Sequence, residues 1–149
     1  MKKFLKFIGI LAVIYIIVFA CNKILSKKIE NDINNSSVME KLRAQNEIEQ
    51  ATLIMNSYLP KIIDDKTTAK KIEYSIRENI MKYYFQIKDI TKEELNNNFE
   101  KIKTEQINTI MSSSNNKSYI KAQVKFEYIY LDSAGKILGS FTILPNEYL

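Results

Sequence analysis

Residues 124–143 read VKFEYIYLDSAGKILGSFTI, and this stretch decides the fold. In its first half every second side chain is apolar or aromatic, namely Val124, Phe126, Tyr128 and Tyr130. A period of two is typical of a β-strand with one buried face. Residues 132–135 (DSAG) then predict a turn, in which Gly135 supplies a positive φ. The alternation resumes over residues 137–143 and stops before Pro145, so the C-terminal end is predicted to be a β-hairpin.

A second pair of strands is predicted upstream. Within residues 68–77 the apolar side chains alternate with polar ones and stand at Ile72, Tyr74 and Ile76. Residues 80–88 alternate in the same way and are rich in aromatic side chains. Glu78 and Asn79 lie between the two runs and predict a tight turn. The two runs therefore predict another hairpin.

Each predicted hairpin is preceded by a helix signal. Residues 37–40 (SVME) and 91–94 (TKEE) have the pattern of a capping box, which satisfies free amides at a helix N-terminus. Behind the first box, apolar side chains recur at helical spacing at Ala44, Ile48, Ala51, Met55, Tyr58 and Ile62. Pro60 is expected to end or kink this helix after Tyr58. Behind the second box, a helix is predicted from Leu95, Phe99, Ile102 and Ile110, ending at the polar run 112–118.

The order of these elements, α-β-β-α-β-β, predicts an α+β domain. We expect a four-stranded, mainly antiparallel sheet packed on helices that lie on one face. About 110 residues are enough for one such core. An N-terminal transmembrane or signal helix is expected to precede this domain.

The N-terminal segment carries the net charge of the chain and is predicted to reach the membrane. Residues 1–28 contain six lysines and no acid, whereas the rest of the chain holds sixteen basic and seventeen acidic residues. The run 7–20 is apolar and uncharged. A helix over residues 4–25 would be roughly 33 Å long, enough to cross a bilayer core. We therefore divide the chain into an anchor or signal segment (1–26), a polar tether (27–37) and a domain (38–149).

Three fates of this segment are open on the sequence: a retained helix, a lipoprotein signal, and a cleaved signal peptide. Residues 18–21 (VFAC) resemble a bacterial lipobox, in which the cysteine, here Cys21, is acylated. Phe19 departs from that pattern, because a small or β-branched residue is usual there. Three lysines precede the apolar run, and the three that follow it are offset by Glu30 and Asp32. This bias favours an N-terminus in the cytoplasm and a domain in the periplasm or outside the cell.

Composition removes several classes of function. The chain has no His and one Cys, which excludes histidine-based acid–base catalysis, Cys/His zinc sites and disulfides within the chain. The domain has no basic stripe for nucleic acid, because its net charge is near zero. Only three glycines occur, at Gly9, Gly135 and Gly139, and they form no phosphate-binding loop. We expect no cofactor, no metal and no nucleic acid, and a protein partner in the envelope.

Few side chains are candidates for a functional site. The adjacent acid pairs Asp64-Asp65 and Glu93-Glu94 fit helix ends, where carboxylates are favoured, so we assign no catalytic residue. The aromatic side chains on the predicted strands are expected to pack in the core. Tyr84 is the exception, because it lies on the strand face opposite Tyr83 and Phe85. It is the side chain that we expect to contact a partner.

Residues 45–149 resemble a known group of proteins. The segments that carry the resemblance are Asn56 with Leu59-Pro60, Asp64-Asp65 with Thr67, Tyr83-Tyr84-Phe85, the helix from Thr91, and a C-terminal YxYxDxxGKxxGSFTIxP-like hairpin over 128–145. The chain is similar to short, uncharacterised bacterial proteins that are exported or tethered to the membrane. Members often carry a cysteine after the C-terminal motif and another near the end of the second helix. Both are absent here, so that disulfide cannot form; the resemblance implies a fold and a compartment, and transfers no catalytic residue.

These observations favour a membrane-anchored extracytoplasmic protein without enzymatic activity, which acts as an interaction or accessory component of the bacterial envelope. Two alternatives stay open. One is an envelope exclusion or immunity protein encoded by a phage or plasmid, and the other is a carboxylate-based envelope hydrolase.

Overall fold

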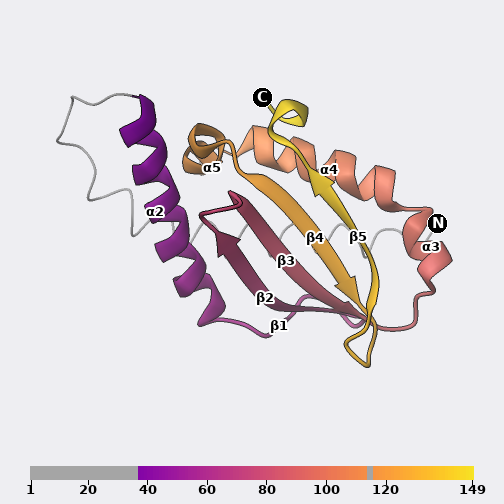
Figure 1. Ribbon diagram of the computed structural model, residues 1–149. Coiled ribbons are helices and arrows are strands. Elements are labelled where there is room, and N and C mark those ends of the chain that lie inside the picture. Colours follow the sequence, from indigo (N-terminus) through magenta and orange to yellow (C-terminus); the bar gives the residue numbers. More distant parts are fainter. Residues whose placement is uncertain (1–36, 114–115) are drawn as a thin grey trace.

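A five-stranded sheet with helices on one face makes up residues 37–113 and 116–149, which the computed structural model describes (Figure 1). The elements in chain order are α2 (Ser37–Asn56), β1 (Lys61–Ile62), β2 (Thr67–Ser75), β3 (Ile80–Ile87), α3 (Lys92–Asn96), α4 (Phe99–Ser112), α5 (Lys117–Ala122), β4 (Lys125–Leu131), β5 (Ile137–Ile143) and the 3₁₀ turn η3 (Pro145–Glu147). The predicted anchor, Cys21 and the predicted tether up to residue 36 lie outside the described residues. Within those residues, no helix has both the length and the apolar content needed to span a bilayer.

The mixed α+β class is confirmed, but the predicted number of strands is wrong. The strands lie side by side in chain order, and the additional strand is β1, which pairs with β2 through Lys61 and Ile62. A strand of two residues is too short to show an alternation of apolar and polar side chains, so the sequence pattern does not predict β1. Three of the four pairings are antiparallel, as expected. The central pairing of β3 with β4 is parallel, because α3, α4 and α5 carry the chain back to the other end of the sheet.

The helix predicted behind Thr91 begins as expected but is interrupted. The capping box at Thr91 is present: the Glu94 amide donates to Thr91 Oγ1 at 3.2 Å, and the Thr91 amide donates to Glu94 Oε2 at 2.9 Å. The helix predicted behind it is split at residues 97–98 into α3 and α4. Asn98 Nδ2 donates to the Glu94 carbonyl at 2.6 Å, and such local side-chain bonds compete with a continuous helix. The six residues of α5 follow a polar run and were not predicted.

In α2 the predicted apolar stripe is buried over only part of its length. Four of its members face the core: Ala44, Ile48, Ala51 and Met55. The helix ends at Asn56, and the chain then leaves it toward β1. Tyr58 and Ile62 therefore lie outside the helix and are 63% and 77% exposed, contrary to the prediction that they extend the stripe.

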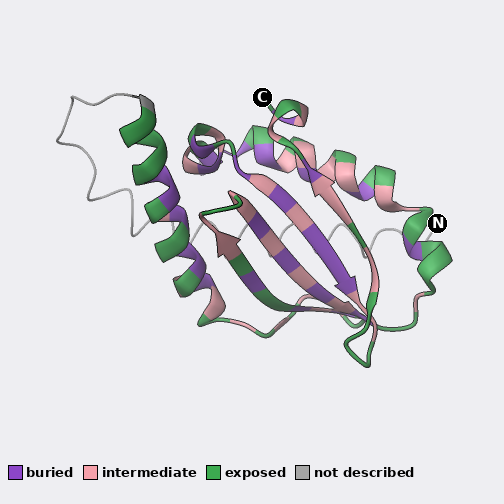
Figure 2. Cartoon of the chain, in the orientation of Figure 1, coloured by how far each residue is buried: buried purple, intermediate pink, exposed green. Residues whose placement is uncertain are grey.

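The core lies between the helices and one face of the sheet. Purple buried positions alternate with less buried ones along the central strands (Figure 2). Aromatic rings from neighbouring strands stack there, with centroid distances of 5.2 Å between Tyr83 and Tyr128 and 5.0 Å between Tyr128 and Phe141. The ring of Phe99 on α4 packs against Phe141 at 5.5 Å. A Cβ at Gly139 would stand 2.8 Å from the Phe99 ring, so a larger residue at this close approach would displace the ring.

Candidate functional site

The sheet face opposite the core is not covered by any helix of the described part of the chain. Cross-strand registers place alternate residues of four strands on this face, which we call the open face. Its central members are Lys71, Glu73, Lys82, Tyr84, Gln86, Glu127, Ile129, Ser140 and Thr142. The helices contact the other face, since Phe126 packs against Tyr119 of α5 and Phe99 of α4 packs against Tyr130. The side chains of the open face range from exposed, as at Lys71, to buried, as at Ile129.

Tyr84 lies at the centre of the open face and is held there by two neighbours on β2. Its hydroxyl donates to Glu73 Oε2 at 2.6 Å, and the Lys71 ammonium stands 4.7 Å from the centre of its ring. Lys71 also forms an ion pair with Glu73 at 2.6 Å. The predicted placement of Tyr84, opposite Tyr83 and Phe85, agrees with these contacts and with the sheet register. Its role in partner contact stays a prediction.

The protonation states of this cluster follow from its contacts. Partial burial, together with the hydrogen bond to the Glu73 carboxylate, raises the pKa of Tyr84 to about 12. The pKa of Glu73 is lowered, chiefly by its hydrogen bond to Lys71 and then by that to Tyr84. Near neutral pH the cluster therefore consists of a neutral phenol, a carboxylate and an ammonium group. A second ion pair, Lys82 with Glu127 at 3.2 Å, adds balanced charge to the same face.

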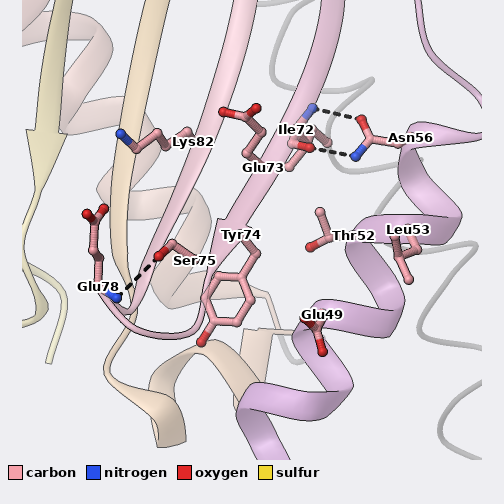
Figure 3. A pocket seen from close by; sticks show the side chains of 10 residues that line it. All are labelled: Glu49, Thr52, Leu53, Asn56, Ile72, Glu73, Tyr74, Ser75, Glu78 and Lys82. Carbon is pink, nitrogen blue, oxygen red and sulfur yellow. Dashed lines mark hydrogen bonds between the residues drawn. The ribbon is translucent and has the colours of Figure 1, made fainter.

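A groove between α2 and β2 borders the open face and has a volume of about 490 Å³. Figure 3 shows its walls: α2 contributes Glu49, Thr52, Leu53 and Asn56, and the strands and their turn contribute Ile72, Glu73, Tyr74, Ser75, Glu78 and Lys82. We call it the β2 groove. At one end the Asn56 amide bridges helix and strand. The Ile72 amide donates to Asn56 Oδ1 at 2.9 Å, and Asn56 Nδ2 donates to the Ile72 carbonyl at 2.5 Å.

The side chains that could have formed a catalytic or cation site serve local structure instead. Asp64 Oδ1 accepts bonds from the amides of Lys66 and Thr67 in a turn, and Glu94 belongs to the capping box described above. Asp132 Oδ1 accepts bonds from two amides of its own hairpin. Among the residues with described positions, no three metal-binding side chains gather into a site.

The β2 groove was missed by sequence reasoning. Asn56 and Ile72 are 16 residues apart, and no local pattern marks their pairing. One signal was present: Leu53 interrupts the polar side of α2 and is 62% exposed. Taken alone, an exposed leucine is common on protein surfaces and would not have identified a groove.

Comparison with known proteins supports the fold and gives no activity. A family model described as a domain of unknown function (DUF8479) matches residues 41–139, and thus ends before the last residues of the C-terminal motif. No curated protein matches the chain.

Similar folds occur among solved structures at very low identity. A candidate secreted protein from Pseudomonas aeruginosa has a TM-score of 0.62 at 8% identity, covering 78% of this chain and 100% of that chain. The type II secretion system pilotin of Vibrio vulnificus has a TM-score of 0.55 at 8% identity, covering 74% and 96%. The type II secretion system pilotin of Vibrio cholerae has a TM-score of 0.52 at 6% identity, covering 76% and 99%.

Proposed function

The chain belongs to the DUF8479 family, a domain of unknown function, and we propose that it is a non-enzymatic interaction or accessory protein of the bacterial envelope. The domain lies outside the cytoplasm, in the periplasm or at the cell exterior. Residues 4–25 hold it to the membrane, as a retained helix or through a lipid on Cys21, and the N-terminus stays in the cytoplasm if the helix is retained. Its partner is another protein of the envelope.

The sheet face that no described helix covers is the observation that carries this proposal. Tyr84, Glu73 and Lys71 form a fixed cluster at its centre, so a partner meets an ordered set of donors, acceptors and one aromatic ring. Ordered side chains lose less conformational entropy on binding than mobile ones do. Attachment to the membrane also raises the effective concentration of the domain near other envelope proteins, so a modest affinity suffices.

Proteins of similar fold are compatible with the proposed accessory role in the envelope. Two of the similar structures are pilotins of type II secretion systems, and a third is a candidate secreted protein. An accessory role in the envelope is therefore compatible with what this fold does elsewhere. Asp64 and Glu94 bond to backbone amides of their own turn and helix end, and these contacts give no support to an enzymatic role.

Site-directed photocrosslinking in cells tests the proposal. A photoreactive phenylalanine is placed at position 84 of the full-length protein, expressed at native level, and the crosslinked products are identified by mass spectrometry. The matched control places the same residue at Glu100, an exposed position of α4 away from the open face. We expect one reproducible envelope protein from position 84 and none from position 100. No product from position 84, or the same product from both positions, would refute a partner at the open face.

A further inference from the structure

We propose that the β2 groove binds an extended, lysine- or arginine-containing segment of a partner protein, which pairs with the free edge of β2. This inference rests on the proposed function, because it describes how the domain would hold a protein partner. It adds a second surface to the open face and states the chemistry of the segment that fits there.

The edge of β2 is only partly paired. β1 is opposite Thr68 and Ala69, and further along the Asn56 amide bonds to both backbone groups of Ile72. Backbone groups of residues two apart in a strand point to the same side. The N–H and C=O of Tyr74 therefore point toward the groove, as those of Ile72 do. No residue of the described ranges bonds to these two groups, and an added strand would pair with them.

This end of β2 is held in place through the Tyr74 side chain and the turn that follows the strand. The Tyr74 hydroxyl donates to Asn79 Oδ1 at 2.9 Å, and Gln45 Nε2 donates to the same oxygen at 3.2 Å. Asn79 Nδ2 in turn donates to the carbonyls of Ala122 and Gln123 at 2.8 and 2.9 Å. The end of β2 thus keeps its position although no strand pairs with it on the groove side. An incoming segment meets preformed backbone groups.

The charges that line the β2 groove favour a cationic partner segment. Three carboxylates line the groove, at Glu49, Glu73 and Glu78, against one ammonium group, Lys82. Glu73 is paired with Lys71, and Lys82 is paired with Glu127 on the open face. Glu49 and Glu78 are exposed and form no ion pair with another described residue. The groove therefore has an excess of negative charge, which complements cationic side chains on alternate positions of a strand.

Peptide binding to the full-length protein in a nonionic detergent tests the proposal. The probe is a fluorescent peptide, KTKVKTKV, whose binding is followed by fluorescence anisotropy. Two analogues accompany it: one with glutamate in place of lysine, and one with the same side chains but N-methylated amides at alternate positions. The second keeps the charge and cannot form a ladder of backbone hydrogen bonds. Hydrogen exchange of the Tyr74 amide is measured with and without the probe.

The variant that tests the charges is Glu49→Gln with Glu78→Gln. Its matched control is Glu40→Gln with Glu100→Gln, which makes the same change in net charge at exposed positions outside the groove. Exposed ion pairs contribute modestly, so we expect the groove variant to weaken binding by about five-fold and the control to leave it unchanged. The Tyr74 amide should exchange more slowly in the complex, and both analogues should fail to bind.

Three results would overturn the inference: equal binding of the N-methylated analogue, equal weakening by the control variant, or absence of probe binding. None of these would affect the proposed function, which is tested by crosslinking at the open face. Conversely, binding at the groove without any crosslink from position 84 would support the strand site and refute the open face as the partner surface.

Discussion

Burial of tyrosine hydroxyl groups predicts that the domain unfolds at alkaline pH. Tyr83, Tyr128 and Tyr130 are at most 4% exposed, and burial raises the pKa of each well above its ordinary value near 10. In the unfolded chain the same groups ionise near their ordinary pKa. The folded state holds the neutral phenol, so the stability linked to these groups is fully present below about pH 10 and is lost as the pH rises toward the folded-state pKa values.

The size of the effect follows from the number of buried groups. Each phenol that stays neutral in the folded state costs about 1.4 kcal/mol of stability for each pH unit above its unfolded pKa. Three such groups cost about 4 kcal/mol near pH 11 and about 8 kcal/mol near pH 12. Single domains have a free energy of unfolding of about 5–15 kcal/mol. A stability of about 5–8 kcal/mol, the lower part of that range, is lost between about pH 11 and 12, and we therefore expect the midpoint of unfolding at or above about pH 11.

Circular dichroism and the ultraviolet absorbance of tyrosinate, recorded over the same pH series on the full-length protein, check this expectation. The buried tyrosines should ionise only as secondary structure is lost. Urea unfolding at several pH values above about 10 should show a weaker dependence of stability on pH in Tyr128→Phe than in the parent protein. Tyr58→Phe is the control, because that side chain is 63% exposed. Complete ionisation of a folded protein, or the same pH dependence in Tyr128→Phe, would refute the reasoning.

Three further predictions concern single positions. Gly139→Ala places a Cβ 2.8 Å from the Phe99 ring and should lower the free energy of unfolding by about 1–3 kcal/mol in urea titration; an unchanged midpoint would contradict the close approach. Asn56→Ala removes both hydrogen bonds to the Ile72 backbone and should cost about 1–3 kcal/mol, measured in the same way. A retained N-terminal helix predicts no palmitate labelling and no change of size in Cys21→Ser; label in the parent that is lost in the variant would identify a lipoprotein.

The sequence predicts the elements of this fold better than their arrangement. Alternation over residues 124–143 and 80–88 and the stripe from Ala44 to Met55 come from local periodicity, because burial of one face imposes it. Which strand pairs with β3 depends on packing across the whole sheet. The parallel pairing with β4 therefore has no local pattern in the sequence. The short strand β1 and the six residues of α5 are held by tertiary contacts rather than by propensity.

The candidate site was predictable to a similar extent. The position of Tyr84 on the face opposite Tyr83 follows from the period of two. Its bond to Glu73 depends on the register of β2 against β3, which the alternation restricts but does not define. Ile129 lies on the outward face of β4 by the period of two, yet it is only 6% exposed, which the alternation alone does not predict. The β2 groove depends on where α2 ends and on the Asn56 side chain, and both are set by tertiary structure.

The parallel pairing of β3 with β4 has a consequence for how the chain is made. The hairpin of β2 and β3 is synthesised before the three helices and β4, so at first it has an unpaired inner edge and exposes the aromatic side chains Tyr83 and Phe85. Pairing across such a sequence separation requires closure of a long loop and slows folding. A chain that ends before residue 131 lacks part of the strand that fills the middle of the sheet. Until residues 125–131 have been made, the inner edge of β3 therefore has no strand to pair with.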